Sequence, residues 1–228
     1  MSTTSDSRPL IVFDVLGTLV DQTGSMRREV QAATGWNATD SDQLVTKWLH
    51  YVAMREREII AGDATFSPSH DLDAAALAHL VAEGALPAHL SATVANASRH
   101  LEPWPDSVER LALLTEDMTV GGLSNASHQV LAALIEDSGM SWHLTLSAED
   151  ARTYKPAPEI YQLALAATPA GKKPPYLVAA HAWDLRAAAS AGMRTAYVPR
   201  PGGDAPTDDD EFDVYADDLA HLHALLRA

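Results

Sequence analysis

The chain has 228 residues, of which 46% are hydrophobic and 21% charged, enough apolar material for a core domain with an insertion. Its 31 acidic and 16 basic residues give a formal charge of −15, which argues against the basic surface that nucleic-acid binding needs. The absence of cysteine excludes a disulfide framework, a thiolate zinc site and a cysteine nucleophile. Neither a secretory signal nor an apolar run of membrane-spanning length is recognisable, so we expect a cytoplasmic protein that binds no membrane.

Short apolar runs alternate with helical patterns along most of the chain. The predicted strands cover residues 10–13, 118–123, 143–147, 176–180 and 195–198. The helical patterns cover residues 108–114, 128–137, 158–167, 185–191 and 216–227. This alternation predicts an α/β fold with a doubly wound parallel sheet and right-handed crossovers.

The segment after the first strand breaks the alternation. Four helical patterns follow one another there without a β-rich run, at residues 25–34, 40–61, 72–82 and 87–101. We therefore expect an all-helical cap domain of residues 23–101, inserted into a core domain of residues 1–22 and 102–228. Within the cap, the charged run at residues 55–58 is interpreted as a solvated helix face.

Polar residues follow the predicted strands at their carboxyl ends. They are Asp14 after the first strand, Ser124 and Asn125 after the second, Lys155 after the third, and His181 and Asp184 after the fourth. Because ligands of open α/β sheets bind beyond the carboxyl ends of the strands, we expect these side chains to converge on one crevice. Two carboxylates, a hydroxyl and an amine in one crevice indicate a reaction centre.

The motifs that carry these residues resemble those of the haloacid dehalogenase (HAD) superfamily. They are DVLGTLV at residues 14–20, LSN at 123–125, YKPAPEIY at 154–161 and HAWD at 181–184. Their order and their positions at strand ends agree with the superfamily over nearly the whole chain. The resemblance implies a Rossmann-like core with an inserted cap.

Leu16 separates the groups within this superfamily. Its phosphatases place a second aspartate two residues after the nucleophile, where the carboxyl group protonates the leaving alcohol and activates water. Leucine can do neither, whereas L-2-haloacid dehalogenases are similar to this chain in having an apolar or aromatic residue there. The resemblance implies hydrolytic dehalogenation of small L-2-haloacids to 2-hydroxy acids through an aspartyl ester, with no metal and no cofactor.

Four residues receive catalytic roles at the nucleophile. Asp14 would attack C2 of the haloacid, and Thr18 would hydrogen-bond the Asp14 carboxylate. Lys155 would supply positive charge, and Asp184 would pair with Lys155 and orient or deprotonate the hydrolytic water. Two alternatives stay open, in which Thr18 is a local turn hydroxyl and Asp184 caps the helix at residues 185–191.

Ser124 and Asn125 complete the catalytic set as donors to the substrate carboxylate or to the ester oxyanion. The alternative for Asn125 is to cap the helix that begins near Ser127. The substrate-binding residues are expected to be Leu16, His50, Tyr161, His181 and Trp183. Ordinary core packing is the alternative for Tyr161 and Trp183, and a purely structural role is the alternative for His181.

One position departs from the dehalogenase pattern. Those enzymes carry an arginine directly after a cap tryptophan, where it helps to hold the halide, but here the pair is Trp48-Leu49. His50 or a cation on another turn of the cap would have to replace it; the candidates are Arg28, Lys47, Arg55 and Arg57. Two further hypotheses therefore stay open, a phosphatase of the same fold and a non-catalytic relative that binds small molecules. The expected partners are a small anionic 2-haloacid and halide, and the resemblance is compatible with a homodimer.

Overall fold

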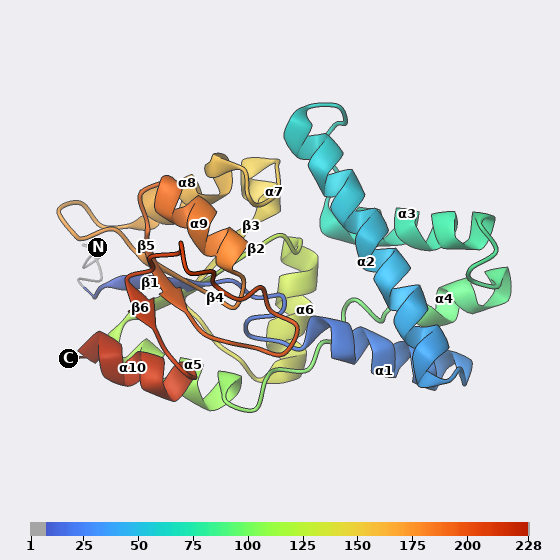
Figure 1. The fold of residues 1–228 in the computed structure, drawn as a ribbon, viewed down its shortest axis with the longest axis horizontal. Coiled ribbons are helices and arrows are strands. Elements are labelled where there is room, and N and C mark those ends of the chain that lie inside the picture. The colour runs from blue at the N-terminus through green and yellow to red at the C-terminus, as the bar shows by residue number, and fades with distance from the viewer. Residues whose placement is uncertain (1–7, 228) are drawn as a thin grey trace, which may run out of the picture.

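A six-stranded parallel sheet forms the centre of the molecule, which we describe from a computed structural model covering residues 8–227. The strands lie in the order β3-β2-β1-β4-β5-β6 (Figure 1). Their bounds are β1 Leu10–Phe13, β2 Thr119–Ser124, β3 Leu144–Ser147, β4 Tyr176–Ala179, β5 Arg194–Tyr197 and β6 Val214–Tyr215. The predicted doubly wound α/β fold is confirmed, while the two-residue β6 was missed because the acidic tail before it gives no strand signal. The expected domain limits at residues 1 and 228 lie outside the described residues.

Alternate residues of the buried strands supply two hydrophobic cores. Ile11 and Phe13 of β1 belong to one core, and Leu10 and Val12 belong to the other. The first core takes in α5 (Ser107–Asp117), α6 (His128–Ser138) and α10 (Leu219–Arg227). The second takes in α8 (Pro158–Ala167) and α9 (Ala182–Ser190), and the short α7 (Ala148–Ala151) follows β3. Side chains of a strand point to opposite faces in turn, so an unbroken apolar run is what a sheet covered on both faces requires.

A group of helices stands to one side of the sheet, at the right of Figure 1. It consists of α1 (Gln22–Thr34), α2 (Ala38–Ala61), α3 (Ser69–Ala82), the 3₁₀ turn η1 (Ala88–Leu90) and α4 (Ser91–Val94). The prediction of one helix over residues 87–101 is wrong, because only η1 and α4 form there. Asn96 and Ser98 follow α4, and both residue types compete with the helical backbone for hydrogen bonds.

The chain leaves the sheet for the helices α1–α4 near Asp21 and returns to it near Glu102, and these two crossing points lie side by side. The amide of Asp21 donates to the carbonyl of Glu102 over 2.9 Å. The division into a core of residues 1–22 and 102–228 and a cap of residues 23–101 stays a prediction, and this crossing lies next to its expected limits.

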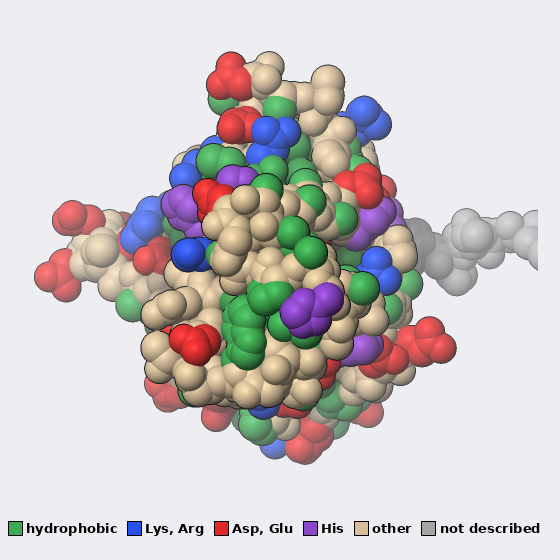
Figure 2. Space-filling view, turned by 90° about the vertical axis from the view of Figure 1, so that its right-hand side faces the viewer, with side chains coloured by type: hydrophobic (Ala, Val, Ile, Leu, Met, Phe, Trp, Pro, Cys, Tyr) green, Lys and Arg blue, Asp and Glu red, His purple; other side chains and the backbone are tan. Residues whose placement is uncertain are grey.

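The surface of the cap end is chemically mixed. Figure 2 shows acidic, basic and histidine side chains interspersed around a central group of hydrophobic ones. Within residues 8–227, no helix combines the length and the apolar character that crossing a bilayer requires.

Candidate active site

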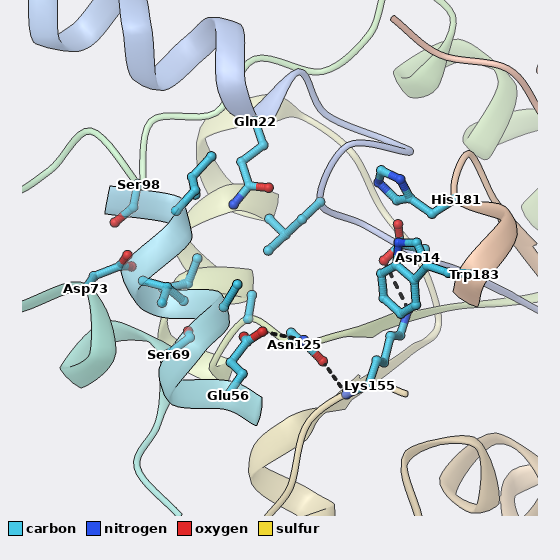
Figure 3. A pocket seen from close by; sticks show the side chains of 16 residues that line it. Asp14, Gln22, Glu56, Ser69, Asp73, Ser98, Asn125, Lys155, His181 and Trp183 are labelled. Atoms are coloured by element: carbon cyan, nitrogen blue, oxygen red, sulfur yellow. Dashed lines mark hydrogen bonds and ion pairs between the residues drawn. The ribbon is translucent and has the colours of Figure 1, made fainter. Parts of the chain in front are cut away.

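The strand order places a crevice at the carboxyl ends of β1 and β4. From β1 the chain runs on to β2 on one side, while β4 pairs with β1 on the other, which makes this the switch point of the sheet. Asp14 directly follows β1, and its amide donates to Val178 of β4 over 2.9 Å. A cavity of about 240 Å³ lies here between the sheet and the cap helices, and Asp14 lines it (Figure 3).

The hydroxyl of Thr18 binds the Asp14 carboxylate and is itself bound by the end of β4. The Thr18 hydroxyl donates to Asp14 Oδ2 over 2.7 Å and accepts from the amide of Ala180 over 2.9 Å. Thr18 therefore links the loop after β1 to the end of β4, so its hydroxyl does more than stabilise a local turn. Asp14 lines the cavity with only 6% of its surface exposed, and the hydrogen bond from Thr18 fixes the position of its carboxylate.

Lys155 lies between two carboxylates in the interior. Its Nζ is 3.0 Å from Asp14 Oδ1 and 2.6 Å from Asp184 Oδ2. Burial, the largest influence, lowers the pKa of Lys155, but the charges of Asp14 and Asp184 together raise it above its ordinary value. The side chain thus keeps its positive charge although only 2% of it is exposed.

Asp184 is enclosed behind Lys155 rather than open to the cavity. It is fully buried, and its Oδ1 accepts a hydrogen bond from the hydroxyl of Tyr161 over 2.6 Å. Burial raises the pKa of Tyr161, so its phenol remains a donor. His181, not Asp184, is the residue that precedes α9, so the capping alternative for Asp184 is wrong. Neither Asp184 nor Tyr161 lines the cavity. The expectation that Tyr161 contacts the substrate is therefore corrected, and so is the expectation that Asp184 contacts the hydrolytic water.

Asn125 connects the core to the cap. Its Oδ1 accepts from the amide of Lys155 over 2.8 Å, and its Nδ2 donates to Glu56 Oε2 over 3.2 Å. The capping alternative for Asn125 is wrong, because the side chain of Ser127 caps α6. Ser124 is fully buried and its hydroxyl accepts from the amide of Ala126 over 3.1 Å. Since Ser124 does not line the cavity, the expectation that its hydroxyl meets the substrate is corrected.

Leu16, His181 and Trp183 line the cavity as expected from the sequence. The rings of His181 and Trp183 stack with centroids 6.0 Å apart, and Figure 3 shows both beside Asp14. Gly17 has a φ of +85°, and a Cβ added to it would lie 2.7 Å from His181 Nε2. Glycine therefore accommodates both the backbone turn and the close approach of the imidazole.

One face of the cap helix α2 lines the cavity with apolar side chains and one glutamate. Leu49, Val52, Ala53 and Glu56 of α2 all line the cavity, and their spacing places them on one helix face. His50 lies off this face, is exposed, and lines a separate groove on the cap, so the prediction that it contacts substrate is wrong.

None of the suggested replacement cations reaches the cavity. Arg28 pairs with Asp21 and Glu102, and Arg55 pairs with Glu58. Lys47 lines two other surface grooves and Arg57 is exposed, and neither is among the cavity residues.

Sequence reasoning missed the polar residues that the cap contributes. Glu56 belongs to the run interpreted as a solvated face, yet it faces the cavity, and burial raises its pKa to about 8. Asp73 also lines the cavity and accepts from Trp48 Nε1 over 2.6 Å. The spacing of Glu56 from Leu49 could have shown that both lie on the same helix face. No sequence pattern indicated that Asp73 would reach the cavity.

Comparison with known proteins identifies the family. The family model of the haloacid dehalogenase-like hydrolases matches residues 9–192. This chain belongs to the haloacid dehalogenase-like hydrolases. The resemblance found in the sequence is thereby confirmed at the level of the superfamily.

Members of this family with dehalogenase names are similar to the chain in sequence and in structure. An (S)-2-haloacid dehalogenase of Pseudomonas fluorescens is 30% identical over 48% of this chain and 50% of its own length. A second relative, (S)-2-haloacid dehalogenase 4A of Burkholderia cepacia, is 34% identical over 47% of this chain and 48% of its own length. The chain thus spans about half the length of the curated relatives it matches.

Solved structures cover the chain more completely. One L-2-haloacid dehalogenase superposes with a TM-score of 0.86 at 27% identity, over 97% of this chain and 99% of its own. A defluorinating L-2-haloacid dehalogenase superposes with a TM-score of 0.84 at 27% identity, over 97% of this chain and 96% of its own. Sheet and cap helices are therefore arranged here as in these structures.

The family member described here shows no preformed metal site in the part of the chain that the structure covers. Within residues 8–227, no three His, Asp or Glu side chains are grouped so that they could hold an ion. The expectation that activity needs no metal stays a prediction.

Proposed function

We propose that this protein hydrolyses the carbon–halogen bond of small L-2-haloacids, giving 2-hydroxy acids through an ester on Asp14. The observation that carries the proposal is the pairing of Asp14, held by Thr18 and Lys155, with Leu16 in the same cavity. A carboxylate nucleophile with no acid two residues away suits a leaving group that needs no proton, and halide is one. The names of the relatives support the same reaction class.

In the first step, a carboxylate oxygen of Asp14 attacks C2 of the haloacid. The new C–O bond forms as the carbon–halogen bond breaks, and the halide leaves with the electron pair. Leu16, Leu49 and Val52 give this part of the cavity an apolar wall that excludes water from the reacting carbon.

In the second step, water attacks the carbonyl carbon of the Asp14 ester. Whichever carboxyl oxygen is not esterified keeps a donor, since Lys155 serves Oδ1 and Thr18 serves Oδ2. The water must also lose a proton. Because Asp184 is enclosed, we assign this proton to His181, whose imidazole lines the cavity and makes no hydrogen bond within residues 8–227. The bond between the carbonyl carbon and the ester oxygen then breaks. The imidazolium returns the proton to the departing oxygen, so that the 2-hydroxy acid and the free Asp14 carboxylate are released.

Hydrolysis at the ester carbonyl leaves the bond between C2 and oxygen intact. The configuration at C2 is therefore inverted once, and an L-2-haloacid gives a D-2-hydroxy acid. The homodimer and the cytoplasmic location expected from the sequence stay predictions.

The decisive test is halide release from L- and D-2-chloropropionate, bromoacetate and fluoroacetate. We expect the wild type to release halide from the L-isomer with or without EDTA, and Asp14→Asn to release none. Asp208→Asn is the matched control, since Asp208 is an exposed loop carboxylate. No halide from any substrate would refute the proposal, and magnesium-dependent hydrolysis of an aryl phosphate would favour the phosphatase hypothesis instead.

The role of His181 has its own signature. In His181→Ala the ester should form and then persist, so one equivalent of halide per active site appears in a burst before slow turnover. A variant that turns over steadily without a burst would show that another group takes the proton.

A further inference from the structure

The cap wall of the Asp14 cavity is acidic where an anionic substrate must bind. Figure 3 shows Glu56 and Asp73 on the cap side, opposite Asp14 and His181. Among residues 8–227, Lys155 is the only lysine or arginine that lines this cavity. An anion entering it meets three carboxyl groups and one ammonium group.

The charge of Lys155 is already compensated. Its Nζ contacts both Asp14 and Asp184 within 3.0 Å, so these three groups carry a net charge of −1 when all are ionised. An ionised Glu56 would add a second unbalanced charge beside the incoming anion. A proton on Glu56 removes this charge and therefore favours binding of an anionic 2-haloacid.

Glu56 lines the cavity, and one of its oxygens has no hydrogen-bond partner among residues 8–227. Oε2 accepts from Asn125 Nδ2, and Asn125 is the only hydrogen-bond partner of this carboxyl group in the described part of the chain. The orientation of the Asn125 amide is set independently, because its Oδ1 accepts from the amide of Lys155. A proton on Glu56 Oε1 therefore has no protein acceptor and is available to a ligand.

Several charged or titratable groups face Glu56. Burial is the main cause that raises its pKa to about 8, and the charge of Asp73 on α3 adds to the rise. The hydrogen bond from Asn125 and the charge of Arg57 on α2 oppose it. Tyr154 lies close enough for Glu56 to affect it, but burial raises the pKa of this phenol, so it remains neutral.

We propose that Glu56 is a specificity-determining residue that binds the anionic substrate as a neutral carboxylic acid, donating a hydrogen bond from Oε1 to an anionic group of the ligand. This inference rests on the proposed function for the identity of the anion, which is either the substrate carboxylate or the departing halide. No proton is transferred. The acid contributes a donor at neutral pH and repels the anion when it ionises.

Asp73 is not placed for the same role. Its carboxyl group is engaged by two donors, Trp48 Nε1 over 2.6 Å and the hydroxyl of Ser98. These contacts leave Asp73 as a group that influences Glu56 rather than as the donor to the ligand.

The test compares pH profiles of the wild type, Glu56→Gln and Glu58→Gln between pH 6 and pH 10. In the wild type, KM for L-2-chloropropionate should rise about tenfold from pH 7 to pH 9, because only the protonated fraction binds. Glutamine keeps a neutral donor, so Glu56→Gln should bind at pH 7 within about threefold of the wild type and lose the alkaline rise. Glu58→Gln is the matched control, because Glu58 lies on the same helix, pairs with Arg55 and does not line the cavity. An unchanged alkaline rise in Glu56→Gln would overturn the proposal.

Calorimetric binding of propionate and of bromide separates this inference from the proposed reaction. The anion that Glu56 contacts should lose affinity above pH 8 in the wild type but not in Glu56→Gln. If no halide is ever released but this pH dependence is found, the dehalogenase proposal fails and the anion site stands. If halide is released and neither anion nor substrate responds to Glu56→Gln, the reaction stands and the role of Glu56 fails.

Discussion

Replacing Lys155 by methionine is the substitution whose effect the structure predicts in most detail. At an effective dielectric constant of about 20, the contacts of 3.0 and 2.6 Å from Nζ to the two carboxylates amount to about 5.5 and about 6.4 kcal/mol of gross attraction. Desolvation of the buried ammonium, the largest single influence on its pKa, offsets part of this attraction. Because removing one partner leaves the buried carboxylates uncompensated, we expect the free energy of unfolding to fall by about 3–5 kcal/mol.

Activity should fall with it. Loss of 3–5 kcal/mol of charge compensation in the transition state corresponds to a decrease of roughly 10²–10⁴-fold in kcat/KM. Urea denaturation and halide release measure the two effects, with Lys172→Met in an exposed loop as the control. The double variant Lys155→Met/Asp184→Asn should regain part of the stability but none of the activity, which separates folding from catalysis. The reasoning is refuted if Lys155→Met loses less than about 1 kcal/mol and keeps more than a tenth of the activity.

Three further substitutions test other parts of the site. Tyr161→Phe removes the 2.6 Å hydrogen bond to the buried Asp184 carboxylate, so urea denaturation should show a loss of about 2 kcal/mol; an unchanged midpoint would mean that this contact is not formed. Gly17→Ala combines a φ of +85° with a Cβ 2.7 Å from His181 Nε2, so turnover should drop at least about tenfold and stability by about 1 kcal/mol or more; full activity would contradict the tight fit. For Glu56, burial shifts the pKa from 4.5 to about 8 in the folded protein, so the folded state binds this proton more tightly than the unfolded state. The wild type should therefore lose stability relative to Glu56→Gln as pH rises from 5 to 8, by on the order of 3 kcal/mol, and the difference should level off above pH 8; a difference independent of pH would refute the burial of this acid.

The sheet could be predicted from the sequence because its signals are local. The run at residues 10–13 is apolar at every position, which both faces of a covered parallel strand demand, and β1 forms where this run lies. β6 could not be predicted, since it has only two residues and is defined by its pairing with β5 at the edge of the sheet, which the local sequence does not reveal.

The core side of the site was also accessible to sequence reasoning. Asp14 and Asn125 directly follow β1 and β2, and His181 lies two residues beyond β4, so the topology alone brings them to one crevice. The topology does not specify which of these side chains reach the cavity and which are buried behind it. Asp184 and Tyr161 belong to the same network but lie behind Lys155, out of reach of the cavity.

The cap side was predicted poorly because it depends on how a helix is rotated toward the sheet. His50 and Glu56 lie within two turns of α2, and the rotation of that helix turns Glu56 inward and His50 outward. The charged run at residues 55–58 has the composition of a solvated helix face. The one sign to the contrary is the spacing of Glu56 from Leu49, which places both residues on the same face of the helix.

The origin of the oxygen atom in the product tests the ester on Asp14 most directly. In a single turnover of excess enzyme in H₂¹⁸O, the hydroxyl oxygen of the 2-hydroxy acid should come from the Asp14 carboxylate and be unlabelled. Mass spectrometry of the peptide that contains Asp14 should then show one ¹⁸O atom in that side chain. Labelled product together with an unlabelled Asp14 peptide would mean that water attacks C2 itself, and would contradict the covalent mechanism.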